Sequence, residues 1–238
     1  MPTLLRLGET KVEVVRRAIK NVHLSVYPPT GRVRISAPTH LSDDAVRLFA
    51  IAKLGWIRRQ QSKLREQERE SPREFLDRES HYLWGRRYLL KIVETEGASG
   101  VEPRPRALVL RLRSGASRDD AQPVLAKWYR AEVRREAESM IARWEPTLAV
   151  KVRGLFVQQM KTRWGSCNAG AHTIRLNTEL AKKPPECLEY IVVHEMLHLI
   201  EPTHGRRFVA MLDRVLPQWE RTRDLLNRLP ARHENWRY

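Results

Sequence analysis

The feature that most constrains this 238-residue chain is a short histidine-rich segment bounded by prolines. Pro184 and Pro185 suit the start of a helix, because the N–H that proline lacks would be unpaired there in any case. Pro202 predicts that the helix has ended before it. Between these limits apolar residues recur at helical spacing, namely Leu188, Ile191, Val192 and Met196. The segment therefore predicts one helix with an apolar face and defined ends.

The same helix carries the pattern H-E-x-x-H, formed by His194, Glu195 and His198. Two histidines four residues apart project from one side of a helix, about 5–6 Å from each other. Both can then reach one Zn²⁺ ion at ~2.0–2.1 Å. Glu195 is then the general base for water that the metal activates, and later the proton donor. The alternative is a buried amphipathic helix with incidental histidines, which the correctly placed glutamate argues against.

A catalytic zinc site needs three protein ligands and one open position. His204 follows the predicted helix break and is the natural third ligand after His194 and His198. Metzincins share this spacing but carry a glycine where this chain has Glu201, so the chain departs from that class. Glu201 itself remains an alternative ligand. We therefore expect one zinc ion per chain, held by the three histidines.

The composition excludes several classes of protein. With 42% hydrophobic and 30% charged residues the chain is globular rather than wholly disordered. Its best apolar run, residues 48–57, contains Lys53 and is much shorter than the ~20 residues of a membrane span. Cys167 and Cys187 cannot build a disulfide framework, and no secretory signal is visible. We expect a cytoplasmic protein with no membrane partner.

The net charge of +16 indicates anionic partners without identifying one. The excess is larger in residues 1–118, with 24 basic and 13 acidic side chains, than in residues 119–238, with 20 and 15. Weak association of this basic surface with nucleic acid is one interpretation. The other is a genome-wide codon bias towards arginine, with the side chains simply solvated.

The N-terminal part predicts strands followed by a helix. Residues 21–37 alternate apolar and polar positions around the turn 28–31, which predicts a β-hairpin ended by Pro38. Ser42 is the predicted cap of a helix that continues to Trp56. The charged stretch 58–78 is interpreted as the end of that helix followed by a linker.

Further strands and helices alternate in blocks, which predicts an α+β fold. Strands are expected at 82–84, 88–93 and 108–112, with a loop at 97–105. A long helix is expected from Asp119 to about Trp144, stopped by Pro146, then strands at 150–157 and 174–176, with the remainder helical. The expected division is an N-terminal β-rich accessory region, 1–115, and a catalytic region, 116–238, unless both form one compact domain.

Three segments carry a resemblance to a known family. They are Met160 to Cys167 (M-K-T-R-W-G-S-C), Ile174 to Asn177, and Tyr190 to His198 followed by His204. Together they resemble the YgjP-like metal-dependent hydrolases, relatives of the SprT-like proteases with a zincin fold. The resemblance extends upstream through the hairpin, residues 52–57 and residues 82–88.

The resemblance implies a zincin-like core behind an N-terminal β-rich region. It also implies zinc on His194, His198 and His204, with Glu195 catalytic. Members of this family are usually regarded as metallopeptidases on the basis of fold, and nucleotide pyrophosphatase activity on UTP has also been attached to the family. Fold analogy therefore leaves the substrate open.

The segment from Arg163 to Cys167 has two interpretations. In zincins a strand beside the metal cleft can pair with an extended peptide. Arg163 would then neutralise an oxyanion or a phosphate, and Trp164 would help to bind the substrate. Alternatively Trp164 covers the core and Gly165 permits a tight turn. Cys167 is either a fourth, inhibitory zinc ligand or, as we expect, a structural buried thiol.

Three functions remain in competition. The first is zinc-dependent hydrolysis of peptide bonds, with Glu195 and Arg163 as catalytic residues. The second is a nucleoside triphosphate pyrophosphohydrolase acting on UTP, in which Arg206 and Arg207 would hold phosphates and Mg²⁺ would arrive only with the substrate. The third is a basic nucleic-acid-associated protein with structural zinc. Structural zinc normally has four ligands, and only three are evident, so the metallopeptidase is favoured.

Overall fold

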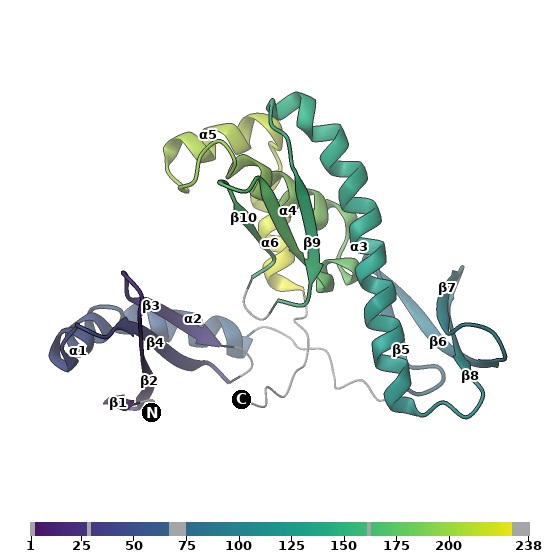
Figure 1. The fold of residues 1–238 in the computed structure, drawn as a ribbon, viewed down its shortest axis with the longest axis horizontal. Coiled ribbons are helices and arrows are strands. Elements are labelled where there is room, and N and C mark those ends of the chain that lie inside the picture. The colour runs from purple at the N-terminus through teal and green to yellow at the C-terminus, as the bar shows by residue number, and fades with distance from the viewer. Residues whose placement is uncertain (1–2, 28–29, 67–74, 161–162, 230–238) are drawn as a thin grey trace. The chain divides into compact units, whose positions relative to one another are not determined.

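The computed structural model describes residues 3–27, 30–66, 75–160 and 163–229 (Figure 1). The fold is α+β, as predicted. Its described residues divide into two compact units, one before residue 67 and one from residue 75 to residue 229, and each is described below by itself. No helix in the described ranges is both long and apolar enough to cross a membrane.

The first unit is a four-stranded sheet with two helices. Its strands are β1 (Thr3–Leu7), β2 (Thr10–Arg17), β3 (His23–Tyr27) and β4 (Arg32–Pro38), in the order β1-β2-β4-β3. The predicted hairpin is confirmed by the antiparallel pairing of β3 with β4, and its turn residues 28–29 lie outside the described residues. Strands β1 and β2 were not predicted, and β2 lies at the centre, parallel to β4.

Alternation along these strands builds the core of the first unit. Val12, Val33 and Ile35 are fully buried on one face of the sheet and pack in one cluster with Ala50 and Ile57 of the helices. The helices are α1 (Asp43–Ala52) and α2 (Leu54–Glu66). The single helix predicted from Ser42 to Trp56 is therefore two helices, because α1 ends at Ala52 and α2 begins at Leu54 after the capping residue Lys53. Ser42 caps α1 as predicted, accepting a hydrogen bond from the Ala45 N–H at 3.2 Å.

The second unit begins with another four-stranded sheet. Its strands are β5 (Ser80–Leu83), β6 (Arg86–Thr95), β7 (Gly100–Arg104) and β8 (Ala107–Arg113), in the order β5-β6-β8-β7. The prediction of a loop over 97–105 is wrong, because β7 pairs antiparallel with β8 there. An edge strand tolerates Pro103, whose missing N–H would interrupt a central strand.

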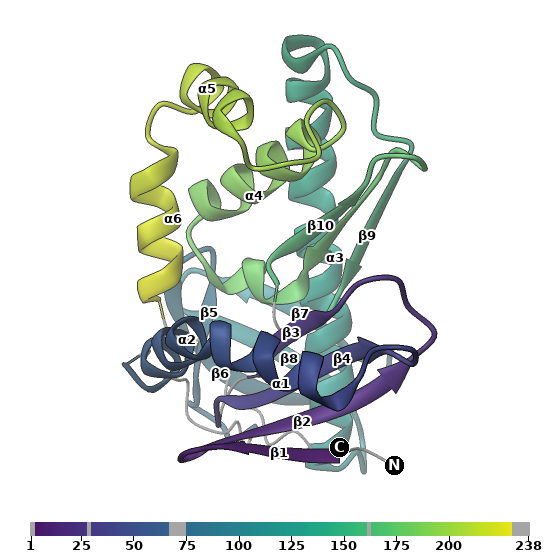
Figure 2. The ribbon, with the colours of Figure 1, turned by 90° about the vertical axis from the view of Figure 1, so that its left-hand side faces the viewer.

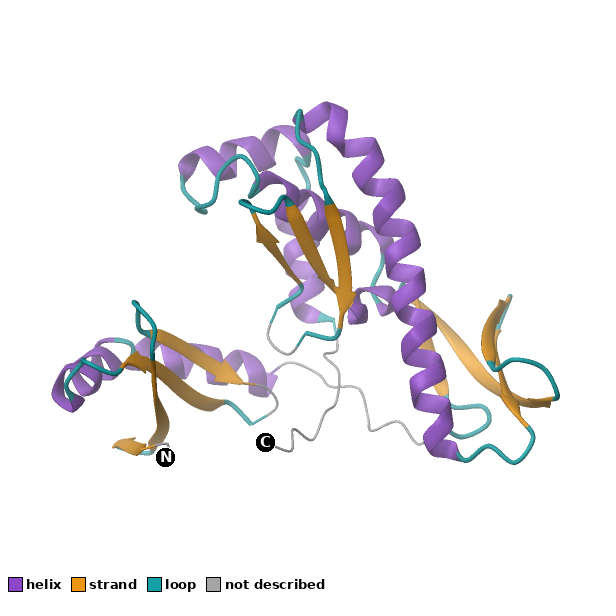
Figure 3. Ribbon diagram, viewed as in Figure 1, coloured by secondary structure: helices purple, strands orange, loops and turns teal. Residues whose placement is uncertain are grey.

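One long helix, α3 (Arg118–Leu148), runs past both sheets of the second unit (Figure 3). At its start, Asp120 accepts hydrogen bonds from the backbone N–H and the hydroxyl of Ser117. The prediction that Pro146 stops the helix is wrong. The helix continues to Leu148 and ends where Ala149 adopts a left-handed conformation, φ 51°. Pro146 removes one i→i−4 hydrogen bond, and the helix continues for two residues beyond it.

The rest of the second unit consists of a three-stranded sheet and the helices that follow it in the chain. A three-stranded sheet has the order β10-β11-β9 and consists of β9 (Gly154–Gln158), β10 (Gly165–Asn168) and β11 (Thr173–Asn177). A 3₁₀ helix, η1 (Thr178–Lys182), leads to α4 (Pro185–Leu197), α5 (Arg206–Val215) and α6 (Trp219–Arg228). Helix α4 packs against β10 and β11 and also contacts α3, α5 and α6 (Figure 2). Strand β10 agrees with one of the two interpretations of the segment from Arg163 to Cys167, that of a strand beside the metal cleft.

The division into units differs from the boundary expected after residue 115. Leu90 and Leu108 of the β5–β8 sheet lie in the same buried cluster as Val133 of α3 and Leu188 of α4. Because one core includes both the sheet and the helices, residues 75–229 form a single unit rather than two regions.

Candidate metal centre

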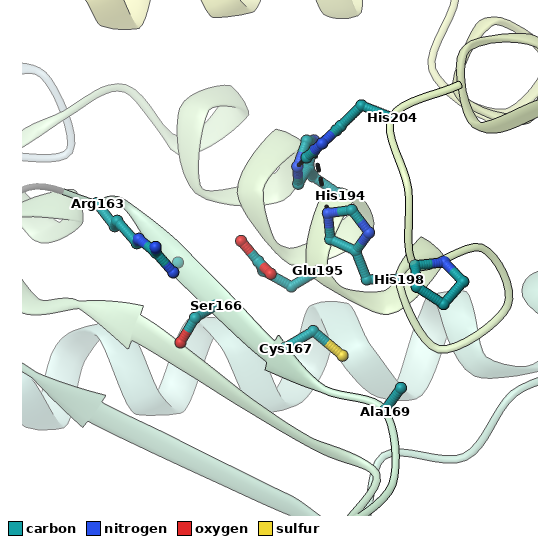
Figure 4. A pocket seen from close by; sticks show the side chains of 10 residues that line it. Arg163, Ser166, Cys167, Ala169, His194, Glu195, His198 and His204 are labelled. Atoms are coloured by element: carbon teal, nitrogen blue, oxygen red, sulfur yellow. Dashed lines mark hydrogen bonds between the residues drawn. The ribbon is translucent and has the colours of Figure 1, made fainter. Parts of the chain in front are cut away.

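Helix α4 fixes the position of the metal-binding motif because the helix is buried on most sides. It begins at Pro185, as the proline pair predicts, and Val192, Val193 and Met196 on it are inaccessible to solvent. His194 and Glu195 lie in its last turn, and His198 is the capping residue that follows. The chain then turns and brings His204 back to the helix end, immediately before α5 (Figure 4).

The three predicted ligands converge through their Nε2 atoms. The Nε2 atoms of His194 and His204 lie 2.9 Å apart, and those of His198 and His204 lie 3.1 Å apart. Within the described ranges, these three residues are the group whose ligand atoms could hold a metal ion together. Three nitrogens that bind one tetrahedral ion at ~2.1 Å lie about 3.4 Å from one another, so this spacing is close to that of a bound state.

The protonation of the rings also fits a metal. The Nδ1–H of His198 is within hydrogen-bonding reach of the Glu201 carbonyl oxygen at 3.0 Å, which leaves Nε2 with a free lone pair. Burial, together with the neighbouring His198 and His204, lowers the pKa of His194 to about 4. Burial likewise lowers the pKa of His204. Neutral imidazoles are the form that ligates a divalent metal, so this donor set fits zinc.

Phe208 supports all three rings from α5. It is 2% exposed, and its ring centroid lies 4.9, 4.7 and 4.9 Å from those of His194, His198 and His204. Sequence analysis did not single it out. Its position could have indicated this role, because it lies four residues after His204 in a helix that starts just beyond that ligand.

Glu195 lies beside the histidines in a nearly dry environment. It is 5% exposed, and burial raises the pKa of its carboxyl to about 7, while the Arg163 guanidinium opposes that shift. A Cβ atom added at Gly165 would lie 2.6 Å from Glu195 Oε1 and 2.8 Å from its Cγ. The strand therefore approaches the carboxylate as closely as a glycine permits. Gly165 belongs to β10 rather than to the tight turn considered above.

A pocket of about 420 Å³ opens in front of these groups. One wall is formed by the three histidines and Glu195, and the opposite wall by β10 and the residues at its ends (Figure 4). Arg163 contributes to this second wall, so the structure brings the two predicted catalytic residues to the same pocket. Ser166 and Ala169 also line it and were not predicted.

Asn177 holds the segment that carries Arg163. Its side-chain amide donates to the backbone carbonyls of Met160 and Arg163, both at 2.9 Å. The side-chain oxygen accepts from Glu179 N at 3.1 Å. Asn177 is 5% exposed, so its amide is committed to these bonds. Sequence analysis missed this role, although a buried asparagine at a strand end is typical of a residue that bonds local backbone.

The predicted substrate-binding residues Trp164, Arg206 and Arg207 are not among the described residues that line the pocket. Trp164 packs against the core, with the Lys183 amine 5.9 Å from its ring centroid. Arg206 and Arg207 are exposed at the start of α5, and Arg207 lies 4.0 Å from Glu201. The Glu201 carboxylate accepts from the Thr203 hydroxyl at 2.8 Å.

Cys167 lines the pocket but lies outside the histidine group that could hold a metal. Burial raises its pKa to about 11, and the Glu195 carboxylate contributes to the shift. Burial raises the pKa of Cys187 to about 12. Both cysteines are free, and both thiols are neutral at pH 7.

Comparison with known proteins identifies a family that the sequence matches. The profile described as "YgjP-like, metallopeptidase domain" matches residues 20–229. Among solved structures, the metallopeptidase zymogen of Pyrococcus abyssi abylysin is 19% identical, with a TM-score of 0.36 over 40% of this chain and 99% of its own. The zymogen of Methanocaldococcus jannaschii jannalysin is 20% identical, with a TM-score of 0.35 over 38% and 87%. No curated protein matches the chain.

Proposed function

This chain belongs to the YgjP-like, metallopeptidase domain family, and from that premise we propose that it hydrolyses peptide bonds with zinc held by His194, His198 and His204. The family makes the chain a metallohydrolase of the metallopeptidase type. The observation that carries the assignment to this site is the convergence of three Nε2 atoms beside a buried glutamate.

Zinc is the favoured ion because all three donors are imidazoles. Magnesium prefers oxygen ligands, so it would enter only with a substrate that carries it. Three protein ligands leave one coordination position open, as in catalytic rather than structural zinc sites. When bound, zinc supplies a Lewis acid that acidifies water and polarises a carbonyl group.

Glu195 transfers protons in the proposed reaction, and Arg163 stabilises developing negative charge. Glu195 takes the proton from the attacking water and returns it to the leaving amine. Its burial keeps competing solvent away, and Gly165 holds β10 against it. Arg163 lies on the opposite wall of the same pocket, where its guanidinium stabilises the negative charge that develops on the carbonyl oxygen.

Strand β10 provides the surface along which a peptide would lie. It is the edge strand of the β10-β11-β9 sheet and lines the pocket through Gly165, Ser166 and Cys167. An extended peptide can add to such an edge through backbone hydrogen bonds. A nucleoside triphosphate would need several cations, and Arg163 is the only one among the described residues of the lining. The peptide is therefore the favoured substrate.

The test uses zinc-loaded protein with an unstructured protein substrate and, separately, with UTP. Glu195→Gln should reduce peptide hydrolysis by ~10²–10⁴-fold, because it removes the general base. Its zinc content should stay at one ion per chain. Glu186→Gln is the matched control, since it makes the same chemical change at an exposed position in the first turn of α4.

Two results would contradict the proposal. Full peptidase activity in Glu195→Gln would remove Glu195 from the mechanism. Phosphate release from UTP without any proteolysis would replace the peptide with a nucleotide as substrate.

A further inference from the structure

The two faces of the sheet in the first unit differ in charge. The face towards the helices is apolar and carries Val12, Val33 and Ile35. Alternation of side chains places the charged residues of β1, β2 and β4 on the opposite, outer face. The exception is Arg16, which is in register with the buried Ala37 and pairs with Asp43 of α1. Its cations are Arg6, Lys11, Arg17, Arg32 and Arg34, and its one carboxylate is Glu13.

The single carboxylate is already engaged. Glu13 pairs with Arg32 and with Arg34, whose Nε lies 3.2 Å from Glu13 Oε2. In the ranges that the structure describes, no carboxylate lies within ion-pair distance of Arg6 or Lys11. These two residues are directly opposite each other in the antiparallel β1–β2 pair, and both are exposed. Like charges placed directly opposite destabilise a sheet, so a bound anion would relieve the repulsion.

The cations form a row that ends at an aromatic ring. Val12 is opposite Val33, so Lys11 is level with Arg32, and Arg32 is opposite Tyr27 on β3. Arg6, Lys11, Arg32 and Tyr27 thus cross four strands that lie about 4.8 Å apart. The Arg34 guanidinium lies 5.6 Å from the centroid of the Tyr27 ring. Cations beside a stackable ring are the combination that single-stranded nucleic acid binds.

We propose that this outer face binds single-stranded nucleic acid, with phosphates on Arg6, Lys11 and Arg32 and a base stacked on Tyr27. An acidic peptide would use the cations but gain nothing comparable from the ring. The family match begins at residue 20, after β1 and β2, so it does not account for Arg6 and Lys11. The inference is also independent of the proposed hydrolase, because it uses none of the residues of the metal centre.

The test is fluorescence anisotropy of the full chain with a labelled oligothymidylate of about 20 nucleotides at several salt concentrations. Three phosphate contacts predict a slope of log K against log[salt] of about −2 for a single strand. Arg6→Ser/Lys11→Ser should bring that slope to about −0.7 and weaken binding at least ~10-fold at low salt. Tyr27→Leu should weaken binding ~5-fold or more with the slope unchanged.

The control variant Lys127→Ser/Arg130→Ser removes the same charge from exposed positions on α3 and should bind like wild type. Glu195→Gln should also bind like wild type, which separates this proposal from the metal centre. Thermal melting checks that each variant is folded.

Three outcomes would overturn the proposal. The first is the absence of salt-sensitive binding by the wild type. The second is an equal loss in both double variants, since binding would then follow net charge alone. The third is equally tight, Arg6-dependent binding of polyglutamate, which would assign the face to acidic polypeptides.

Discussion

The two walls of the pocket are built in different ways. On the α4 wall, the spacing of residues along one helix places His194, Glu195 and His198, and a short turn brings in His204. On the β10 wall, Arg163 and Gly165 reach the pocket because β10 pairs with β11 and because Asn177 bonds the backbone before it. The metal ligands and the general base are therefore placed mainly by local sequence. The residues of the β10 wall are placed by contacts between segments that are separate in the sequence. Changes on the two walls should have different effects.

The largest effect is expected on the α4 wall. His204→Ala removes one of three zinc ligands, so zinc affinity should fall by more than ~100-fold and activity should fall with it. Metal analysis after dialysis measures this directly. His40→Ala, at an exposed position in the first unit, should retain one zinc ion per chain. Equal zinc content in the two variants would remove His204 from the ligand set.

Gly165→Ala separates positioning from metal binding. The added Cβ would meet the Glu195 carboxylate at 2.6 Å, so the carboxylate must move. A displacement of about 1 Å predicts a fall in kcat of ~10²-fold, with zinc content unchanged. The matched control is Gly170→Ala, because its Cβ would meet nothing closer than 3.7 Å. Unchanged kcat in Gly165→Ala would show that the close packing has no role in catalysis.

Asn177→Asp tests whether the β10 wall acts through Arg163. The variant keeps the side-chain acceptor but loses the amide that donates to Met160 O and Arg163 O. Peptide kcat/KM should fall ~10-fold, and loss of the buried hydrogen bonds should cost about 1–3 kcal/mol of folding free energy. In the background of Arg163→Ala, the same change should have little further effect on kcat/KM. Fully additive losses would mean that Asn177 does not act through Arg163.

The smallest effect is expected at Phe208, which supports the α4 wall without touching substrate. Phe208→Leu keeps an apolar side chain but loses the stacked contact with His198 and the edge-on contacts with His194 and His204. Zinc affinity should fall several-fold, and the free energy of unfolding should fall by less than ~1.5 kcal/mol. A competition titration with a zinc-binding dye measures the first quantity. A loss as large as that of His204→Ala would contradict a purely supporting role.

The same contrast explains which parts the sequence predicted. The helix that carries His194, the hairpin around residues 28–31 and the cap at Ser42 depend on neighbouring residues, so local pattern was sufficient. Strand β10 was offered only as one of two interpretations, by analogy with zincins. Its four residues contain a glycine and have no clear alternation, and they form a strand by pairing with β11. Strand β7 was missed because its proline is tolerated only at a sheet edge, which local sequence does not reveal.

The candidate site divides in the same way. The predicted ligands lie together because all three come from eleven consecutive residues. Asn177 and Phe208 were missed because their roles depend on atoms that are distant in sequence or on a helix packed against the site. The boundary expected after residue 115 lies inside the second compact unit. The apolar residues of β6 and β8 are buried, but the local sequence does not indicate that they pack in the same core as α3 and α4.

The most direct test of the central claim is X-ray absorption spectroscopy at the zinc edge on the zinc-loaded full chain. Convergence of His194, His198 and His204 predicts three nitrogen ligands with imidazole signatures and one oxygen ligand, all at ~2.0–2.1 Å. The spectrum of His204→Ala, loaded with excess zinc, should lose one imidazole. A sulfur ligand at ~2.3 Å, or fewer than three imidazoles in the wild type, would contradict the account.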